Sequence, residues 1–397
     1  MKKIFKLSSI AVLAIATSAL FTSCDNEGGP TDSQELDSAK MTKVFENYTM
    51  NTVIPTYRSL ADASIELEKA CTAIYEHSKT KAITDADMKA AADAWKNARK
   101  FWERSEAFLL GPAGDLGIDP HIDTWPLDKA TLEAMFADPQ IMESVDADYI
   151  TKHYGAGGMC GFHAIEYVLF EEGNVKAASK IDDLYAKYLW AVSGDLKLHC
   201  FALEGAWAGL ENIDKAKRDF LKEKDFFHDH YDTPIMNFKD HFLNAGASDP
   251  IYKTQLEAMI DAVQGEGGCF GIANEVGTAK IHDPQESKNP LDVESWYSFN
   301  SITDFQDNIR GIKMVIMDGG ENSIYNFIKA ENAELAEKLA KSIDKTIGED
   351  GTTGIGAMPA PFRNHLGNPK NNDAMDACNE LATILQEVAT FFEENYL

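Results

Sequence analysis

Apolar residues recur at helical spacing along almost the whole chain, and this pattern constrains the fold more than any other feature. Between residues 33 and 78 they follow one another every three or four positions, with Pro55 predicting a break or kink. Alternating strand patterns are almost absent, so we predict an all-α protein made of two packed helical bundles. Further helices are predicted at 85–110, 160–171, 181–211, 250–264, 269–280, 300–317, 331–346 and 372–395.

The length of the chain predicts two domains. Its 397 residues are more than one hydrophobic core usually serves. The charged, irregular stretch 213–250 is the candidate junction, so we predict an N-terminal helical bundle over 34–212 and a C-terminal one over 213–397. A Gly-, Pro- and Asp-rich stretch from Gly111 to Pro126 predicts a long loop, and loops of that length are often functional.

The first 23 residues predict a signal peptide. A basic start precedes an apolar run from Leu7 to Phe21, about fifteen residues and too short to span a bilayer comfortably. The order Phe21-Thr22-Ser23-Cys24 resembles a bacterial lipobox, in which the cysteine is acylated and becomes the new N-terminus. An ordinary cleavage site beside a chance cysteine is the alternative. Residues 24–33 lack apolar periodicity and predict a flexible tether.

The charge of the chain limits its partners. A formal net charge of −27 argues against nucleic acid and against an anionic membrane surface as main partners. We expect a lipid on Cys24 to be the only membrane attachment, in a bacterial cell envelope, on the periplasmic or surface face of the outer membrane. Of the six cysteines, five follow Cys24, so at least one thiol should be free, with the pairing left open.

The helix predicted at 85–110 carries two charges on its apolar stripe. Arg99 and Glu106 occupy positions of the stripe that also holds Trp95 and Trp102. Buried charges are costly unless they are paired or coordinated. The alternatives are an internal ion pair, perhaps between these two residues, a stripe edge that reaches water, or a functional site.

A second group of candidates is Gly161-Phe162-His163-Ala164-Ile165-Glu166. On a helix His163 and Glu166 are neighbours, and the apolar residues around them predict that the helix is buried. The pair is either a hydrogen bond in the core or two ligands of a metal ion. Its spacing matches, in the opposite direction, the Glu/His pairs of carboxylate-bridged metal proteins. It does not match the two histidines of a zincin.

A third group lies on the helix predicted at 300–317, where polar residues form a strip separate from the apolar face. Such a strip is typical of a solvent-exposed surface, and it could also complete a site. Its members are Ser301, Asp304, Asn308 and Gly311.

In combination these motifs resemble the imelysin-like family of bacterial envelope proteins, over about residues 40–395. The order of the first-half motifs is Trp95, Arg99, Trp102, Glu106, Gly111-Pro112, Asp123-x-Trp125-Pro126 and Gly161-x-His163-x-x-Glu166; that of the second half is Glu294, Phe299-x-Ser301, Asp304 and Asn308-Ile309-x-Gly311. The resemblance implies two helical bundles with a site near their interface, in exported lipoproteins associated with iron uptake. The family is named for a metallopeptidase.

These observations lead to one expected function and two alternatives. We expect an envelope lipoprotein that binds iron or another divalent metal, or a metal-bearing small ligand, for an uptake system that includes a partner protein. The metal ligands would come from His163, Glu166, Glu106 and Asp304, with Arg99, Trp95, Ser301 and Gly161 supporting them. No catalytic residue is assigned. The alternatives are a metal-dependent peptidase with a base such as Glu106, and a structural or interaction lipoprotein.

Overall fold

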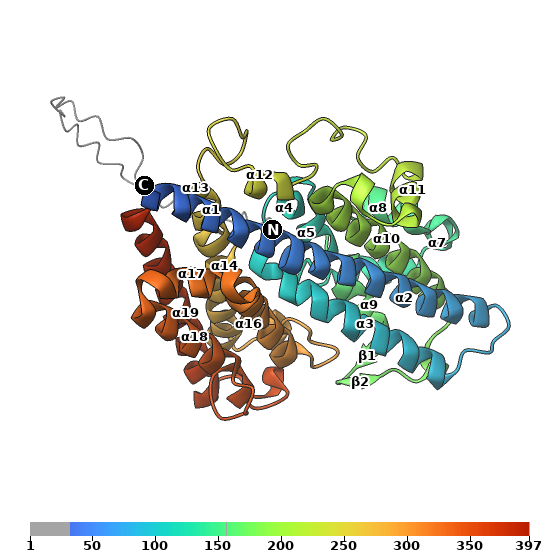
Figure 1. The fold of residues 1–397 in the computed structure, drawn as a ribbon. Coiled ribbons are helices and arrows are strands. Elements are labelled where there is room, and N and C mark those ends of the chain that lie inside the picture. The colour runs from blue at the N-terminus through green and yellow to red at the C-terminus, as the bar shows by residue number, and fades with distance from the viewer. Residues whose placement is uncertain (1–31, 156, 397) are drawn as a thin grey trace, which may run out of the picture.

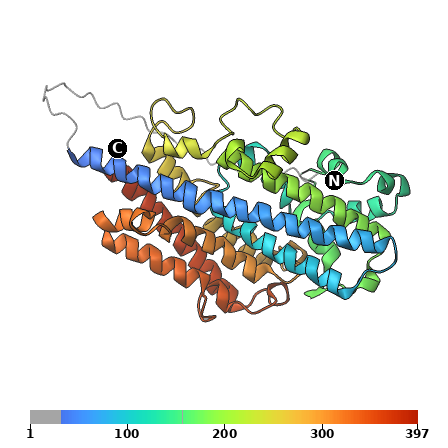
Figure 2. The same cartoon turned by 45° about the vertical axis from the view of Figure 1, so that its right-hand side comes forward.

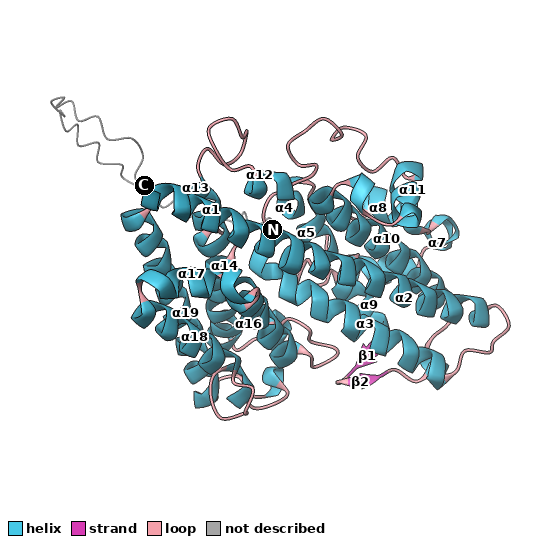
Figure 3. Ribbon diagram, viewed as in Figure 1, coloured by secondary structure: helices cyan, strands magenta, loops and turns pink. Residues whose placement is uncertain are grey.

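A computed structural model describes residues 32–155 and 157–396, and almost all of its regular structure is helical. The all-α prediction is confirmed. The described strands form one small antiparallel hairpin, β1 (Phe170–Glu171) with β2 (Asn174–Val175), in which Phe170 pairs with Val175 (Figure 3). The predicted signal peptide and Cys24 lie outside the described residues. Helix α1 begins at Asp32, one residue before the predicted end of the tether.

One long helical rod runs along the whole molecule. It consists of α1 (Asp32–Asn47), the π-helical segment η1 (Tyr48–Val53) and α2 (Ile54–Ser78), which follow one another without a break. Pro55 lies in the first turn of α2, directly after η1. The break predicted at Pro55 is therefore absent, because the wider π turn accommodates a residue that has no N–H to donate. Figure 2 shows the rod, in blue, crossing both halves of the molecule.

The first group of helices packs around α2. Helix α3 and helix α10 lie against α2, and α9 packs against both α3 and α10. Thr84 and Asp87 form a capping box that starts α3, while Asp182 caps the start of α10. The elements are α3 (Asp85–Ser105), η2 (Glu106–Phe108), α4 (Pro112–Asp115), α5 (Ile118–Ile122), α6 (Lys129–Phe136), α7 (Pro139–Ser144), α8 (Ala147–His153), α9 (Gly161–Leu169), η3 (Ala178–Lys180), α10 (Asp183–Ala208), η4 (Leu210–Asn212) and α11 (Lys215–Glu223).

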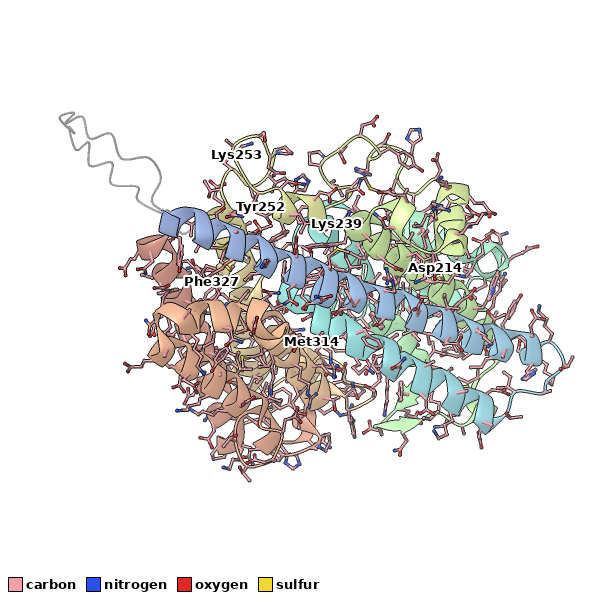
Figure 4. The ribbon with its side chains drawn as sticks, in the orientation of Figure 1. Asp214, Lys239, Tyr252, Lys253, Met314 and Phe327 are labelled. Atoms are coloured by element: carbon pink, nitrogen blue, oxygen red, sulfur yellow. The ribbon has the colours of Figure 1, made fainter. Side chains whose placement is uncertain are left out.

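The second group packs around the last helix. Helices α13, α14 and α18 contact α19, and α16 packs on α18. Met314 on α16 and Phe327 on α17 lie in this group, and Tyr252 and Lys253 lie on the loop before α13 (Figure 4). The elements are α12 (Lys239–Leu243), α13 (Gln255–Gln264), α14 (Cys269–Glu275), η5 (Val276–His282), α15 (Asp283–Ser287), η6 (Pro290–Asp292), α16 (Ser301–Met317), η7 (Gly320–Asn322), α17 (Ile324–Glu331), α18 (Ala333–Ile347), η8 (Ile355–Ala357), η9 (Phe362–Asn364) and α19 (Pro369–Asn395).

The two groups meet where α16 lies against α3 (Figure 1). Gly311 on α16 permits this close approach, because a Cβ there would lie 2.2 Å from the carbonyl oxygen of Arg104. Buried apolar residues from Met41 to Phe392 form one contiguous core through both groups. The division into two domains at residue 213 stays a prediction.

Two further features bear on the environment of the protein. Within the described ranges, no helix combines the length and apolar character needed to cross a bilayer. The five cysteines after Cys24 are all buried: Cys71, Cys200, Cys269 and Cys378 are free thiols, and the thiol of Cys160 donates to the carbonyl oxygen of His121. Their burial makes them packing residues in this structure.

Candidate functional site

The candidate site is built on the buried charges of α3. Arg99 is fully buried, and Glu103 lies one helical turn further along the same face, so the two side chains form an ion pair. The next position on this face is Glu106, in η2. Trp102, also fully buried, covers the charges from one side and donates from its indole nitrogen to Asp123 at 2.6 Å.

Arg99 joins carboxylates from both groups of helices. Its guanidinium pairs with Asp123, just after α5, and with Glu294, in the loop between η6 and α16. Its Nε lies 3.7 Å from Asp304 on α16. The internal ion pair expected for Arg99 therefore exists, but its partners are Glu103, Asp123, Glu294 and Asp304 rather than Glu106.

Gly161 places α9 against this cluster. Its φ of +77° begins the helix in a conformation that glycine adopts readily, and a Cβ would lie 2.0 Å from the carbonyl oxygen of Ile122. The end of α5, with Asp123, can therefore approach the start of α9, with His163. Trp95 fixes the same turn from α3 by donating to the carbonyl oxygen of Phe162 at 2.9 Å.

Glu166 orients the imidazole of His163. Its Oε2 accepts from Nδ1 of His163 at 3.1 Å, while its Oε1 accepts from the backbone nitrogens of Tyr297 and Ser298 and from the Ser298 hydroxyl, all within 3.0 Å. A carboxylate that accepts from one ring nitrogen fixes the orientation of the ring and directs the other nitrogen. Glu166 thus has its hydrogen-bonding capacity largely filled.

The other nitrogen of His163 faces two carboxylates. Nε2 lies 3.2 Å from Oδ1 of Asp123 and 3.6 Å from Oε1 of Glu294, and it makes no hydrogen bond of good geometry within the described part of the chain. The three side chains present one nitrogen and two oxygens within 4.8 Å of one another. Imidazole and carboxylate donors of this kind suit a divalent transition metal.

Lys280 is a second built-in cation of the site. The π-helical segment η5 carries it, and π turns occur frequently at functional sites. Its ammonium lies 2.8 Å from Glu294 and 3.3 Å from Glu106, and the side chain is almost completely buried. Glu106 also accepts a hydrogen bond from Asn308 at 2.9 Å. The charges of the carboxylate cluster are therefore partly compensated within the protein.

The polar strip of α16 faces the cluster rather than solvent. Asn308 is fully buried and donates to Glu103 at 2.6 Å, while Ser301 donates to the carbonyl oxygen of Glu294 at 2.6 Å. Asp304 accepts from Ser295 and from Asn300, besides lying near Arg99. The solvent-face interpretation of this strip is wrong, because the strip forms the contact between α16 and α3.

The buried groups divide into two protonation classes. Burial raises the pKa of Glu103 and Glu106 well above the usual range, and it raises that of Asp304 to about 7. Burial alone would also raise the pKa of Asp123 and Glu294, but the charges of Arg99 and Lys280 respectively, together with the nearby imidazole of His163, hold both pKa values below the usual range. Asp123 and Glu294 are thus the ionised carboxylates beside the ring.

The carboxylates around His163 favour the protonated form of its imidazole. Burial and the nearby charge of Arg99 oppose the charged form, yet the close carboxylates of Asp123, Glu166 and Glu294 raise the pKa of His163 well above its usual value. The position between Nε2 and the two carboxylates therefore favours a positive charge, which a proton or a metal ion can supply.

A cleft of about 600 Å³ opens onto this cluster. Its apolar wall includes Leu109, Trp125 and Pro126, while Lys280 is its single basic lining residue. The acidic lining residues are Glu106, Asp119, Asp123, Glu275, Asp283, Asp292 and Glu294. A concave surface with this charge concentrates cations and disfavours anions.

The structure brings the predicted site residues together around the seam between α3, α9 and α16. His163 and Glu166 pair with one another there, Asp304 lies 3.7 Å from Nε of Arg99, and Glu106 lies 3.3 Å from the ammonium of Lys280. The assignment of these four as metal ligands stays a prediction. Sequence reasoning did not single out Glu103, although its position one turn after Arg99 was a signal, and nothing in the sequence pointed to Lys280.

Comparisons with known proteins identify the family of the chain. The family model described as Imelysin (Peptidase_M75) matches residues 53–388. The chain belongs to the imelysin family. A relative named iron-regulated protein A, from Synechococcus elongatus, is 26% identical over 338 residues, which cover 84% of this chain and 80% of the relative. The resemblance inferred from the motifs is therefore confirmed.

Two solved structures share the fold of this imelysin-family chain. An iron-regulated protein A precursor from Parabacteroides distasonis superimposes with a TM-score of 0.75 at 28% identity, covering 93% of this chain and 98% of that one. An imelysin-like protein from Psychrobacter arcticum has a TM-score of 0.59 at 12% identity, covering 89% and 93%. The second of these supports the fold alone.

Proposed function

We propose that this protein is a lipid-anchored envelope protein that binds a divalent metal ion, iron in the first place, for an uptake system. The observation that carries the proposal is the Nε2 of His163, which is buried, has no well-formed hydrogen bond among the described residues, and faces the ionised carboxylates of Asp123 and Glu294. The name of the Synechococcus relative, iron-regulated protein A, supports iron.

The residues of the site would have different roles in binding the metal ion. His163, Asp123 and Glu294 would hold the ion, which would replace the proton of Nε2. Glu166 would act through His163 by accepting from Nδ1, an arrangement common for metal-bound histidines. Glu106 and Asp304 would contribute charge at longer range. Arg99 would hold the two ligating carboxylates in place from the opposite side.

The charge of the cleft favours a free or cationic form of the metal as cargo. Seven carboxylates and one lysine line the cleft, so an anionic chelate would meet repulsion at the entrance. A hydrated cation would be attracted and then exchange water for imidazole and carboxylate. Capture at the envelope by a tethered acidic protein fits the predicted lipid on Cys24.

A double variant tests this assignment. Calorimetric titration of the His163→Ala, Glu166→Ala protein with ferrous iron under anaerobic conditions should show at least a hundredfold loss of affinity at one site, because a ligand and its orienting carboxylate are both removed. The exposed pair in His228→Ala, Asp229→Ala is the matched control and should bind like wild type. Equal binding by all three proteins would refute the site, and chelator-sensitive cleavage of an unstructured substrate would favour the peptidase alternative.

Replacement of Lys280 provides a second test, in which the affinity for the metal ion is expected to rise rather than fall. Lys280→Met should raise the affinity for the divalent ion about tenfold, because the ammonium competes for Glu294 and repels an incoming cation. A tenfold gain corresponds to about 1.4 kcal/mol, which is less than the repulsion of several kcal/mol expected between an ammonium and a divalent ion a few ångströms apart at an effective dielectric constant near 20. The exposed Lys215→Met is the control. Unchanged or weaker binding by Lys280→Met, in a protein that folds, would contradict this competition.

A further inference from the structure

A second cluster of side chains that could hold a metal ion is formed by residues of α5 and α10. His121 comes from α5, and Asp195 and His199 come from successive turns of α10. One ligand atom of each lies within 4.8 Å of the other two. The three residues share no member with the His163 site, although His121 and Asp123 are only two positions apart. Figure 1 shows α5 beside α10 in the first group of helices.

The three side chains are packed tightly around one carboxylate. Nε2 of His121 lies 2.8 Å from Oδ2 of Asp195, and the rings of His121 and His199 are stacked with centroids 3.8 Å apart. Asp195 is completely buried, while the two imidazoles retain 6% and 5% of their surface. The cluster therefore lies just beneath the surface, within reach of a small ion.

The charge of Asp195 is not compensated by a basic residue. Among the described residues, its charged or chargeable partners are the two histidines alone, and the hydroxyl of Thr151 donates to it at 2.6 Å. A buried carboxylate needs a nearby positive charge. This situation differs from that of the His163 site, where Arg99 and Lys280 supply built-in cations. Here no ion-paired lysine or arginine among the described residues supplies that charge, and a bound cation would.

His199 is prepared to act as a ligand. Its Nδ1 donates to the backbone carbonyl oxygen of Asp195 at 2.9 Å, which leaves the lone pair on Nε2. Thr151 in turn orients the carboxylate, and Phe226 packs its edge against the ring of His199. Second-sphere contacts of these kinds are typical of metal sites.

We propose that His121, Asp195 and His199 form a second binding site for a divalent transition metal. Two histidines and one carboxylate are the donor set of non-haem ferrous centres and of several zinc sites, and the two nitrogen donors disfavour calcium and magnesium. In a tetrahedral site with bonds of about 2.0–2.1 Å, ligand atoms stand roughly 3.3 Å apart. The present 2.8 Å contact would therefore open by about half an ångström when the metal replaces the proton between His121 and Asp195.

Cobalt(II) titration of the full chain tests the second site, because low-coordinate cobalt with nitrogen donors absorbs strongly in the visible range. Wild type and His163→Ala should both develop the band of the second site, whereas His199→Ala and Asp195→Asn should each lose it together with one bound equivalent. If the visible band disappeared in His163→Ala but persisted in His199→Ala and Asp195→Asn, the band would belong to the first site, and the second site would be contradicted. An unchanged band and stoichiometry in folded His199→Ala would overturn the proposal.

Crystallography keeps the test independent of variant folding. Circular dichroism shows whether His199→Ala and Asp195→Asn are folded. If either is unfolded, an anomalous map at the cobalt edge from wild-type crystals decides whether cobalt binds at the second site. A peak within bonding distance of His121, Asp195 and His199 is the expected result. A map without a peak there, from crystals of cobalt-saturated protein, contradicts the second site.

Discussion

Arg99→Met is expected to lower the free energy of unfolding by about 3–5 kcal/mol at neutral pH, the loss typical when one partner of a buried ion pair is removed. Methionine has a similar length but no charge, so Glu103, Asp123, Glu294 and Asp304 would remain buried around an apolar side chain. Urea unfolding followed by circular dichroism measures the difference from wild type.

The pH dependence and a matched control sharpen this expectation. In wild type the charge of Arg99 holds the pKa of Asp123 low, so this stabilisation is present above the unfolded pKa near 3.9 and is lost as pH falls through the lower folded value. The deficit of Arg99→Met should therefore stay nearly constant from pH 7 to 4 and shrink as the pH falls below 4. Arg104→Met, on the same helix but partly exposed, should cost less than about 1 kcal/mol. Equal small losses in both variants would show that the charge cluster does not stabilise the seam.

Gly161→Ala is expected to lower the free energy of unfolding by about 2–5 kcal/mol, the second large effect. Its φ of +77° disfavours any side chain by about 1–2 kcal/mol, and overpacking against a rigid neighbour typically adds about 1–3 kcal/mol. The new Cβ would lie 2.0 Å from the carbonyl oxygen of Ile122, so α5 and α9 must separate. Because these helices carry Asp123 and His163, iron affinity should fall as well.

Gly117→Ala is the matched control for this glycine. Its φ is +63°, but no atom lies within 4 Å of the position of its Cβ, so it bears the conformational cost without the clash. Thermal and urea unfolding should show a loss of about 1–2 kcal/mol and unchanged iron binding. A Gly161→Ala protein as stable as Gly117→Ala would mean that the contact between α5 and α9 adjusts easily.

The sequence predicted the fold well because the helical period of apolar residues is a local signal. The long helices α3, α10, α16 and α19 begin and end within a few residues of their predicted bounds. The rod through Pro55 could not be predicted, since no local sequence signal identified the π-helical segment η1 that precedes the proline. The close contact at Gly311 could not be predicted from the sequence, because it depends on the backbone of a helix that is distant in the chain.

The candidate site was predictable in part, for a physical reason. Arg99 and Glu106 were conspicuous because charge on an apolar stripe conflicts with burial, and the spacing of His163 and Glu166 placed them on one helix face. The other residues of the site come from loops, as do Asp123 and Glu294, or from a π-helical segment, as does Lys280. In such segments the spacing of residues in the sequence does not predict where a side chain points. Their convergence depends on tertiary packing, so the sequence did not indicate that Nε2 of His163 faces Asp123 and Glu294.

The central claim is that a metal ion binds between His163, Asp123 and Glu294, and anomalous diffraction from crystals grown anaerobically with ferrous iron tests it most directly. Data above and below the iron edge should give a peak about 2.0–2.2 Å from Nε2 of His163, with carboxylate oxygens of Asp123 and Glu294 at similar distances. The Nδ1 contact to Glu166 should persist. Full hydrogen bonding of His163 to the two carboxylates, with no anomalous peak beside the ring at saturating iron, would contradict the account.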